Sequence, residues 1–171
     1  MNANVSRAVD TEPAQYLTFM LAQEQFAIGI LGIKEIIEYQ GVTEVPMMPP
    51  CVRGVINLRG AVVPVVDLLA RFGRASSAVT KRTCVVIVEV ACGSGERQVM
   101  GLLVDAVNEV LDIASVDIEP PPSFGARLRS DFIQGVGKVR GKFVLLLDVD
   151  RALSIDEIAG FVEAAAEPVA A

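Results

Sequence analysis

The sequence contains no histidine and no tryptophan. Without an imidazole, the chain cannot build a His-based catalytic triad, a His-ligated metal site or a phosphohistidine. Histidine is also the side chain most often used for acid–base catalysis near neutral pH. We therefore predict that the protein is not an enzyme.

The cysteines and the basic residues also lack the spacing that metal sites, redox sites or nucleic-acid binding require. The three cysteines are an odd number with no C-x-x-C pair, so we expect reduced thiols in a cytoplasmic protein. The net charge is −6, and scattered lysine and arginine do not form the basic face that nucleic acid requires. No apolar run reaches roughly 18 residues, and the first residues lack the apolar core of a signal peptide. We expect neither membrane insertion nor secretion.

Hydrophobic residues, in contrast, make up 52% of the chain, which is enough for a folded core. The most informative stretch, from Arg53 to Gly73, reads RGVINLRGAVVPVVDLLARFG. Its two β-branched runs meet at Arg59-Gly60, which predicts a tight hairpin because glycine tolerates the positive φ of such turns. Pro64 lacks an amide donor and should face a sheet edge or a bulge. After Asp67, the leucine spacing predicts one short helix.

A second copy of this pattern, QGVGKVRGKFVLLLDVDRAL, runs from Gln134 to Leu153. The aligned pairs are Gly54 with Gly135, Val55 with Val136, Arg59-Gly60 with Arg140-Gly141, Val63 with Val144, and Asp67 with Asp148. A weaker similarity aligns Phe26–Ile37 with Met100–Leu111 and Glu35 with Glu109. These matches predict two similar β-rich lobes with a junction near residues 74–81. Chance similarity between short apolar hairpins is the alternative.

The remaining segments add strands and breaks to this plan. Residues 1–14 are polar and unpatterned, so we expect a flexible tail. The expected further strands cover residues 15–22, 26–30, 83–91 and 98–104. Ile33 to Ile37 fits either one amphipathic turn or an irregular strand. Three prolines between residues 45 and 51 predict a loop.

The chain is predicted to end in a helix and tail, residues 154–171. Ser154 and Glu157 have the spacing of a capping box, in which each side chain serves a free backbone amide. Ile155, Ile158, Phe161 and Val162 then share one helical stripe. We predict that this stripe packs against the body of a mainly β protein, which occupies residues 15–153.

Three motifs give the chain a family resemblance. They are QYLTFMLAQEQFAIGILGIKEII, P-x-x-V-R-G-V-I-N-L-R-G-A-V-V-P-V-V-D-L and GLLVDAVNEVL. Together they closely resemble the CheW family of chemotaxis coupling proteins, from about Gln15 to the terminal helix. The segment from Asn57 to Leu68 is the most specific, because its turn, proline and aspartate coincide in spacing. The absence of a kinase or receiver segment resembles the free-standing adaptor of the family.

The resemblance implies a fold, a function and a set of partners. The family fold is two SH3-like five-stranded β-barrels around a shared hydrophobic core. The implied function is a non-enzymatic adaptor, without metal or cofactor, at receptor arrays in the cytoplasm. Its implied partners are the chemoreceptor cytoplasmic tip and the regulatory domain of the histidine kinase CheA. The implied binding residues are Ile33, Glu35, Ile36, Gly54, Arg59 and Gly60, with Gly101 in the second lobe. The Met/Pro-rich loop at residues 46–51 departs from the family pattern.

Two of these side chains also have a plainer interpretation. From spacing alone, Arg59 is a solvated turn residue, whereas the resemblance makes it a fork of donors for a partner carboxylate or carbonyl. Glu35 alone is a solvated charge, but beside Ile33 and Ile36 it would centre an apolar patch suited to a receptor helix. Arg140 is interpreted as a solvated turn residue.

The enzyme-class alternative is a response-regulator-like phosphoacceptor, because FVLLLDVD superficially resembles a receiver strand. A receiver requires alternating helices and strands with an acidic pair after its first strand, and the run from Thr83 to Glu89 brings no such pair. Asp148 and Asp150 supply only two carboxylates, too few for a metal site. We therefore predict no phosphoacceptor activity.

Overall fold

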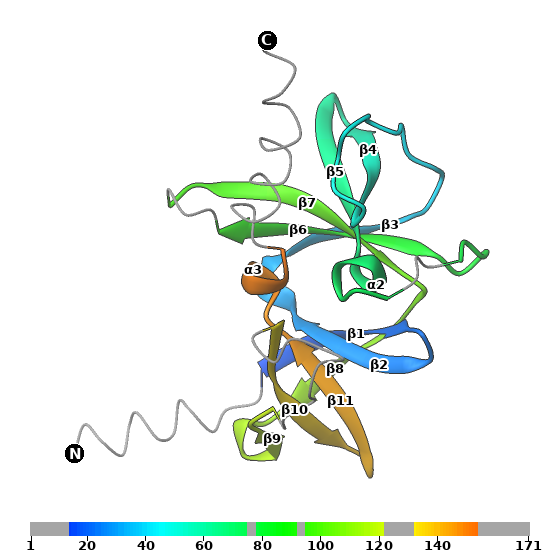
Figure 1. Ribbon diagram of the computed structural model, residues 1–171. Coiled ribbons are helices and arrows are strands. Elements are labelled where there is room, and N and C mark those ends of the chain that lie inside the picture. Colours follow the sequence, from blue (N-terminus) through cyan, green and yellow to red (C-terminus); the bar gives the residue numbers. More distant parts are fainter. Residues whose placement is uncertain (1–13, 75–77, 92–94, 122–131, 154–171) are drawn as a thin grey trace.

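The structure is a computed structural model, and it describes residues 14–74, 78–91, 95–121 and 132–153. The predicted terminal helix at 154–171 and all but Ala14 of the predicted tail lie outside the described residues. Two sheets, whose strands pair mostly in antiparallel fashion, form two lobes with short helices between them (Figure 1). The fold class is therefore mainly β, as the sequence predicts. No helix of the described part is long and apolar enough to cross a bilayer.

Lobe A is the six-stranded sheet with the order β8-β1-β2-β11-β10-β9. Its strands are β1 (Ala14–Leu21), β2 (Glu24–Gly29), β8 (Ala106–Ile113), β9 (Ile118–Glu119), β10 (Ile133–Val139) and β11 (Lys142–Leu147). Lobe B is the five-stranded sheet with the order β3-β6-β7-β5-β4. Its strands are β3 (Ile33–Glu38), β4 (Val52–Leu58), β5 (Ala61–Asp67), β6 (Cys84–Ala91) and β7 (Arg97–Val104). The one-turn helices are η1 (Ile30–Gly32), α2 (Leu68–Arg71), η2 (Ser115–Asp117) and α3 (Val149–Ala152).

The two lobes have the same strand plan. Each has five long strands in equivalent order, and β9 lies beside β10 as the single bridging residue Thr43 lies beside β4. The two hairpins share even their irregularity, a register shift between Val52 and Gly54 and another between Ile133 and Gly135. This plan is consistent with the predicted internal repeat and with five-stranded SH3-like lobes.

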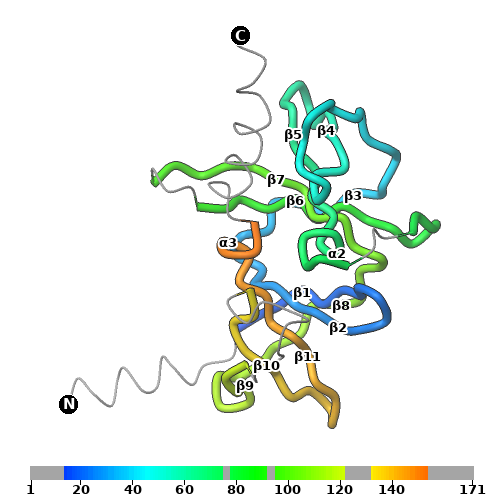
Figure 2. Tube along the Cα trace, viewed as in Figure 1, coloured from blue at the N-terminus to red at the C-terminus, as the bar shows by residue number. Residues whose placement is uncertain are grey.

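The lobes do not follow the two halves of the sequence. Within the described residues, the chain changes sheet only at η1 and at Asp105. As a result, lobe B is the continuous stretch 33–104, which joins β3, β4 and β5 of the first repeat to β6 and β7 of the second. The strand pairs β1–β2 and β6–β7 are thus exchanged between the repeats. The expected junction at 74–81 falls within lobe B, between α2 and β6. The crossing trace can be followed in Figure 2.

A shared core lies between the lobes. Alternate residues of β1 and β6, such as Phe19 and Val88, point into this core, and both are almost completely buried. The intervening residues of β6, Val85 and Ile87, fill a separate core inside lobe B. Burial on both faces explains why β6 is a nearly continuous β-branched run in the sequence.

Local predictions around the first hairpin also agree with the structure. Ile33 to Glu38 is an irregular strand, with a register shift between Ile33 and Glu35. Val55 opposes Pro64 but exchanges both of its backbone hydrogen bonds with Thr43. The nitrogen of Pro64 therefore faces the side of β5 where pairing with β7 has not begun, so no ladder donor is missing.

Both hairpins end in an aspartate that begins a short helix. The buried carboxylate of Asp67 accepts hydrogen bonds from the amides of Leu69 at 3.1 Å and Ala70 at 3.4 Å. Asp148 accepts one from the amide of Arg151 at 3.2 Å and caps α3. Helix α3 was not predicted, although the alignment of Asp148 with the helix-capping Asp67 indicated a second capped helix there.

Candidate functional site

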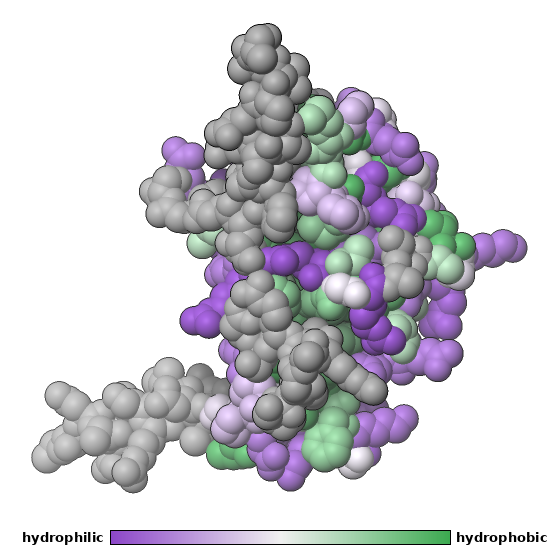
Figure 3. All heavy atoms as spheres, in the orientation of Figure 1, coloured by the Kyte–Doolittle hydropathy of each residue, from purple (hydrophilic) through white to green (hydrophobic). Residues whose placement is uncertain are grey.

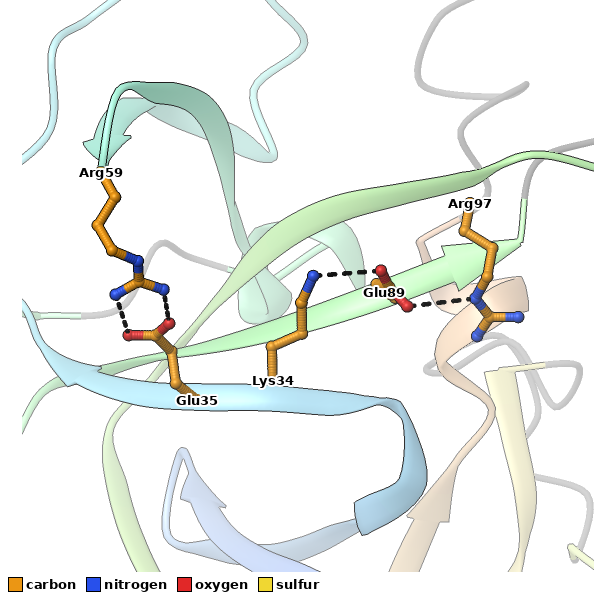
Figure 4. Close-up of polar contacts among 5 residues, drawn as sticks. All are labelled: Lys34, Glu35, Arg59, Glu89 and Arg97. Carbon is orange, nitrogen blue, oxygen red and sulfur yellow. Dashed lines mark hydrogen bonds and ion pairs between the residues drawn. The ribbon is translucent and has the colours of Figure 1, made fainter.

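The predicted binding residues all lie in lobe B. The expected place of Gly101 in the other lobe was wrong, because β7 pairs with β5 in the sheet that also contains β3 and β4. Ile33, Glu35 and Ile36 lie on β3, which is an edge strand of the sheet. Arg59 and Gly60 form the tip of the β4–β5 hairpin. The structure brings these two segments together, although β6 and β7 lie between β3 and the hairpin in the sheet (Figure 4).

The hairpin tip is a tight turn with both central residues in the left-handed region. Arg59 has a φ of 51° and Gly60 a φ of 89°, as a type I′ turn requires. The amide of Gly60 also donates a hydrogen bond of 2.8 Å to Oδ1 of Asn57. This turn fixes the direction in which the Arg59 side chain leaves the hairpin.

The Arg59 guanidinium is paired with Glu35 through two parallel hydrogen bonds. Nη1 donates to Oε1 of Glu35 at 3.2 Å, and Nη2 donates to Oε2. The Glu35 side chain is 28% exposed and that of Arg59 is 72% exposed. The hydrogen bonds from Arg59 hold the pKa of Glu35 below its usual range, and the same bonds raise the pKa of Arg59.

This pair changes the interpretation of Arg59. From the sequence, Arg59 is either a solvated turn residue or a free fork of donors, but in the structure a carboxylate of the same lobe occupies that fork. Exposed ion pairs contribute little to the free energy of unfolding. A bidentate Arg–carboxylate pair does impose geometry, because two parallel bonds fix the planes of both groups. We conclude that the pair ties the hairpin tip to β3.

Apolar and charged side chains surround this pair. Ile36 is 42% exposed, whereas Ile33 is half-buried against the shared core. Next to Glu35, Nζ of Lys34 lies 3.3 Å from Glu89, and Glu89 also pairs with Arg97 at 3.4 Å. On the part of the surface not covered by grey atoms in Figure 3, small hydrophobic areas are interspersed with hydrophilic side chains. Glu89 and Arg97 were not predicted, because nothing in the sequence shows that β6 lies between β3 and β7 in the sheet.

Gly54 and Gly101 lie behind this surface and are both buried. They pair with Val65 from opposite sides, Gly54 in β4 and Gly101 in β7. A Cβ on Gly54 would lie 2.4 Å from the carbonyl oxygen of Thr43, and one on Gly101 would lie 2.7 Å from Cγ1 of Val85. Their absent side chains let the strands of lobe B pack closely, so they support the surface without being exposed on it.

The equivalent end of lobe A has the same residue types in a different arrangement. Arg140 and Gly141 form the turn, with φ of 52° and 77°, and Glu109 lies on β8 in the place of Glu35. Among the described residues, no ion pair joins Arg140 to Glu109. Both residues instead line an open hollow of about 730 Å³, together with Phe143.

The carboxylates of the receiver-like stretch have structural partners. Asp148 caps α3, and Oδ1 of Asp150 accepts a hydrogen bond of 2.9 Å from the amide of Ala91. The latter bond joins the start of α3 in one lobe to β6 of the other.

Comparisons with known proteins agree with this geometry. A model of the CheW-like domain matches residues 15–157. The chain is 34% identical over 158 residues to the chemotaxis protein CheW of Klebsiella aerogenes, covering 92% of each chain. It is 31% identical to the corresponding protein of Rhizobium meliloti, covering 90% of this chain and 96% of the relative. Among solved structures it is similar to the scaffolding protein TtCheW from Thermoanaerobacter tengcongensis. That match has a TM-score of 0.73 and 33% identity, and it covers 83% of this chain and 88% of the other.

Proposed function

The chain belongs to the CheW family and is a chemotaxis scaffold, not an enzyme, and on this premise we propose that it couples chemoreceptors to the histidine kinase CheA in signalling arrays. Its partners are then the cytoplasmic tip of methyl-accepting receptors and the regulatory domain of the kinase. The protein works in the cytoplasm at the receptor array, where it needs no cofactor.

The Glu35–Arg59 pair is the observation that carries this proposal. It joins an edge strand and a hairpin tip into one rigid surface, with Ile36 exposed beside the charges. A helix of a partner protein can lay an apolar face on such a surface and place polar groups against its charged centre. Ile33, Glu35, Ile36, Arg59 and Gly60 form the proposed contact, while Gly54 and Gly101 hold its shape from behind.

The proposal predicts that charge reversal at the tip weakens binding. Arg59→Glu places a second carboxylate opposite Glu35, so the tip moves away from β3. We expect a loss of affinity on the order of thirtyfold or more for a receptor-tip or kinase regulatory-domain fragment, measured by titration calorimetry. Arg140→Glu is the matched control, because it changes the equivalent turn of lobe A outside the proposed surface. Wild-type affinity of Arg59→Glu for both fragments would show that this surface binds neither partner.

The exchanged pair separates two roles for Arg59. In the double variant Glu35→Arg with Arg59→Glu, the ion pair can form again with its charges reversed. Recovery of affinity would show that the pair acts by holding the tip in place. Affinity as weak as that of Arg59→Glu alone would show that the guanidinium itself contacts the partner. Thermal melting followed by circular dichroism checks that each variant remains folded.

A further inference from the structure

The one-turn helices α2 and α3, which follow the two hairpins, both lie between the two sheets (Figures 1 and 2). Arg71 is the last residue of α2, which follows β5 of lobe B, and Ala152 is the last residue of α3, which follows β11 of lobe A. Nε of Arg71 donates a hydrogen bond of 2.8 Å to the carbonyl oxygen of Ala152. This bond satisfies a carbonyl at the C-terminal end of α3, which has no partner within its own helix.

Aromatic rings surround this bond. The guanidinium of Arg71 lies 4.7 Å from the ring centroid of Phe132, the residue just before β10 of lobe A. The next residue, Phe72, has its ring 5.9 Å from Phe132 and 6.0 Å from Phe26 of β2. Phe132 and Phe26 are both buried. Hydrogen-bond, cation–π and ring contacts thus hold the end of α2 against lobe A.

The contact joins equivalent positions of the repeat. Arg71 and Ala152 are 81 residues apart, the same spacing that relates Gly54 to Gly135. By the same alignment, Phe72 corresponds to Leu153 and Phe132 to Cys51. The amides of Asp67 and Asp148 donate to the carbonyls of Cys51 and Phe132, which supports this correspondence. Alanine, leucine and cysteine cannot repeat the polar and aromatic contacts, so they are made on only one side of the internal symmetry.

We propose that Arg71 is a latch that fixes the angle between the two lobes. The hydrophobic attraction of the shared core is non-directional, so directional contacts between the lobes add resistance to rotation of one lobe on the other. These contacts include the bond from Arg71 to Ala152 and the bond from the amide of Ala91 to Asp150. The planar guanidinium has a defined donor direction and a defined stacking face, which rotation would break. Where the proposed function holds, Arg71 is also a positioning residue for the binding of two partners at once.

Distance measurement between the lobes tests the latch without any partner. Nitroxide labels are placed at Val62→Cys and Phe143→Cys, which are equivalent positions on β5 and β11 and are 71% and 63% exposed. Cys51, Cys84 and Cys92 are replaced by alanine in every protein compared. We expect Arg71→Gln to broaden or shift the distance distribution from pulsed electron paramagnetic resonance. Arg151→Gln should leave it unchanged, because within the described part of the chain that side chain pairs with Asp148 of its own helix end, at 3.7 Å.

An unchanged distribution in Arg71→Gln would overturn the proposal. Should that variant lose its cooperative melting transition, Arg71→Lys takes its place. Lysine keeps the charge and an alkyl chain against Phe132, but it cannot stack a planar group while donating to Ala152. An unchanged distribution in Arg71→Lys would then overturn the latch.

Binding measurements test the consequence for partners separately. For Arg71→Gln, we expect normal affinity for a receptor-tip fragment or a kinase regulatory-domain fragment alone. Affinity for the second fragment should fall when the first is already bound. Equal affinity for the second fragment in wild type and variant would overturn the link to partner binding. If the wild type binds neither fragment, the proposed function fails, while the distance measurement still decides the latch.

Discussion

The two hairpin tips, Arg59-Gly60 and Arg140-Gly141, have the same turn conformation, but the surroundings of their arginine side chains differ. At the end of lobe B, Arg59 pairs with Glu35 on β3, the edge strand on the opposite side of the same sheet, and this ion pair closes the lobe. At the end of lobe A, Arg140 and Glu109 occupy equivalent positions and line an open hollow of about 730 Å³. Identical residue types at identical turns are therefore not sufficient for an ion pair. What differs is whether the hairpin tip approaches the edge strand closely enough for the two side chains to meet.

Differences in backbone packing accompany this difference in closure. Gly54 has a φ of 155°, and a Cβ there would lie 2.4 Å from a backbone oxygen of Thr43. At the equivalent Gly135, which lacks a positive φ, the contacts are 2.7 Å to a side-chain carbon of Ile118 and 2.9 Å to a backbone oxygen of Glu119. The hairpin of lobe B is thus held more tightly against its flanking strand than that of lobe A.

The largest expected effect is a stability difference between these two glycines. Gly54→Ala should lower the free energy of unfolding by about 3 to 4 kcal/mol, because it adds a backbone clash to an unfavourable φ. Gly135→Ala should cost about 1 to 2 kcal/mol, since part of its clash is with a side chain that can move. Urea denaturation of both variants measures the difference. Equal costs would mean that the two hairpins are packed equally tightly.

A smaller effect is expected at the β1–β2 turn, which borders the hollow of lobe A. Ala22 and Gln23 have φ of 50° and 69°, in a region that L-residues other than glycine, asparagine and aspartate rarely adopt. Ala22→Gly should raise the free energy of unfolding by about 0.5 to 1 kcal/mol, because relief of strain exceeds the entropy that glycine adds to the unfolded chain. The reverse change in lobe B, Gly60→Ala, should lower it by about 1 kcal/mol. A loss of stability in Ala22→Gly would contradict the assignment of strain to this turn.

The smallest effect concerns the pKa of Glu35. Because its pKa is lower in the folded protein, the pair stabilises the fold at pH values above the ordinary Glu pKa of about 4.3. That contribution is lost as the pH falls through the folded-state pKa. Arg59→Gln should raise the pKa of Glu35, as measured by nuclear magnetic resonance of its carboxyl carbon, whereas Arg140→Gln should leave it unchanged. If Glu35 has the same pKa in the wild type and in Arg59→Gln, the pair does not form in solution.

Much of the fold was predictable because its signals are local. The hairpin at Arg59-Gly60, the short helix after Asp67 and the strand at residues 84–91 each follow from turn chemistry, capping or β-branched runs. The repeat was predictable for the same reason, since it places glycine and aspartate where the backbone demands them.

The exchange of the β1–β2 and β6–β7 strand pairs between the lobes was not predictable from these signals. β3 follows β2 and β8 follows β7 in the sequence, yet β3 pairs with β6 and β8 pairs with β1, and pairing partners leave no local mark. The Glu35–Arg59 pair was missed for the same reason, although both residues were named as part of the site. Gly54 and Gly101 were named by resemblance alone, and only their neighbours in space explain why glycine is needed there.

The order of the strands along the chain also determines which lobe can fold first during synthesis on the ribosome. All strands of lobe B lie within residues 33–104, so they can pair before the rest of the chain has emerged. β1 and β2 emerge earlier but must wait for β8, β10 and β11, a delay on the order of several seconds at ordinary translation rates. During that interval their apolar faces have no partner from lobe A. We expect nascent chains that end between β7 and β8 to be the forms that most need a chaperone.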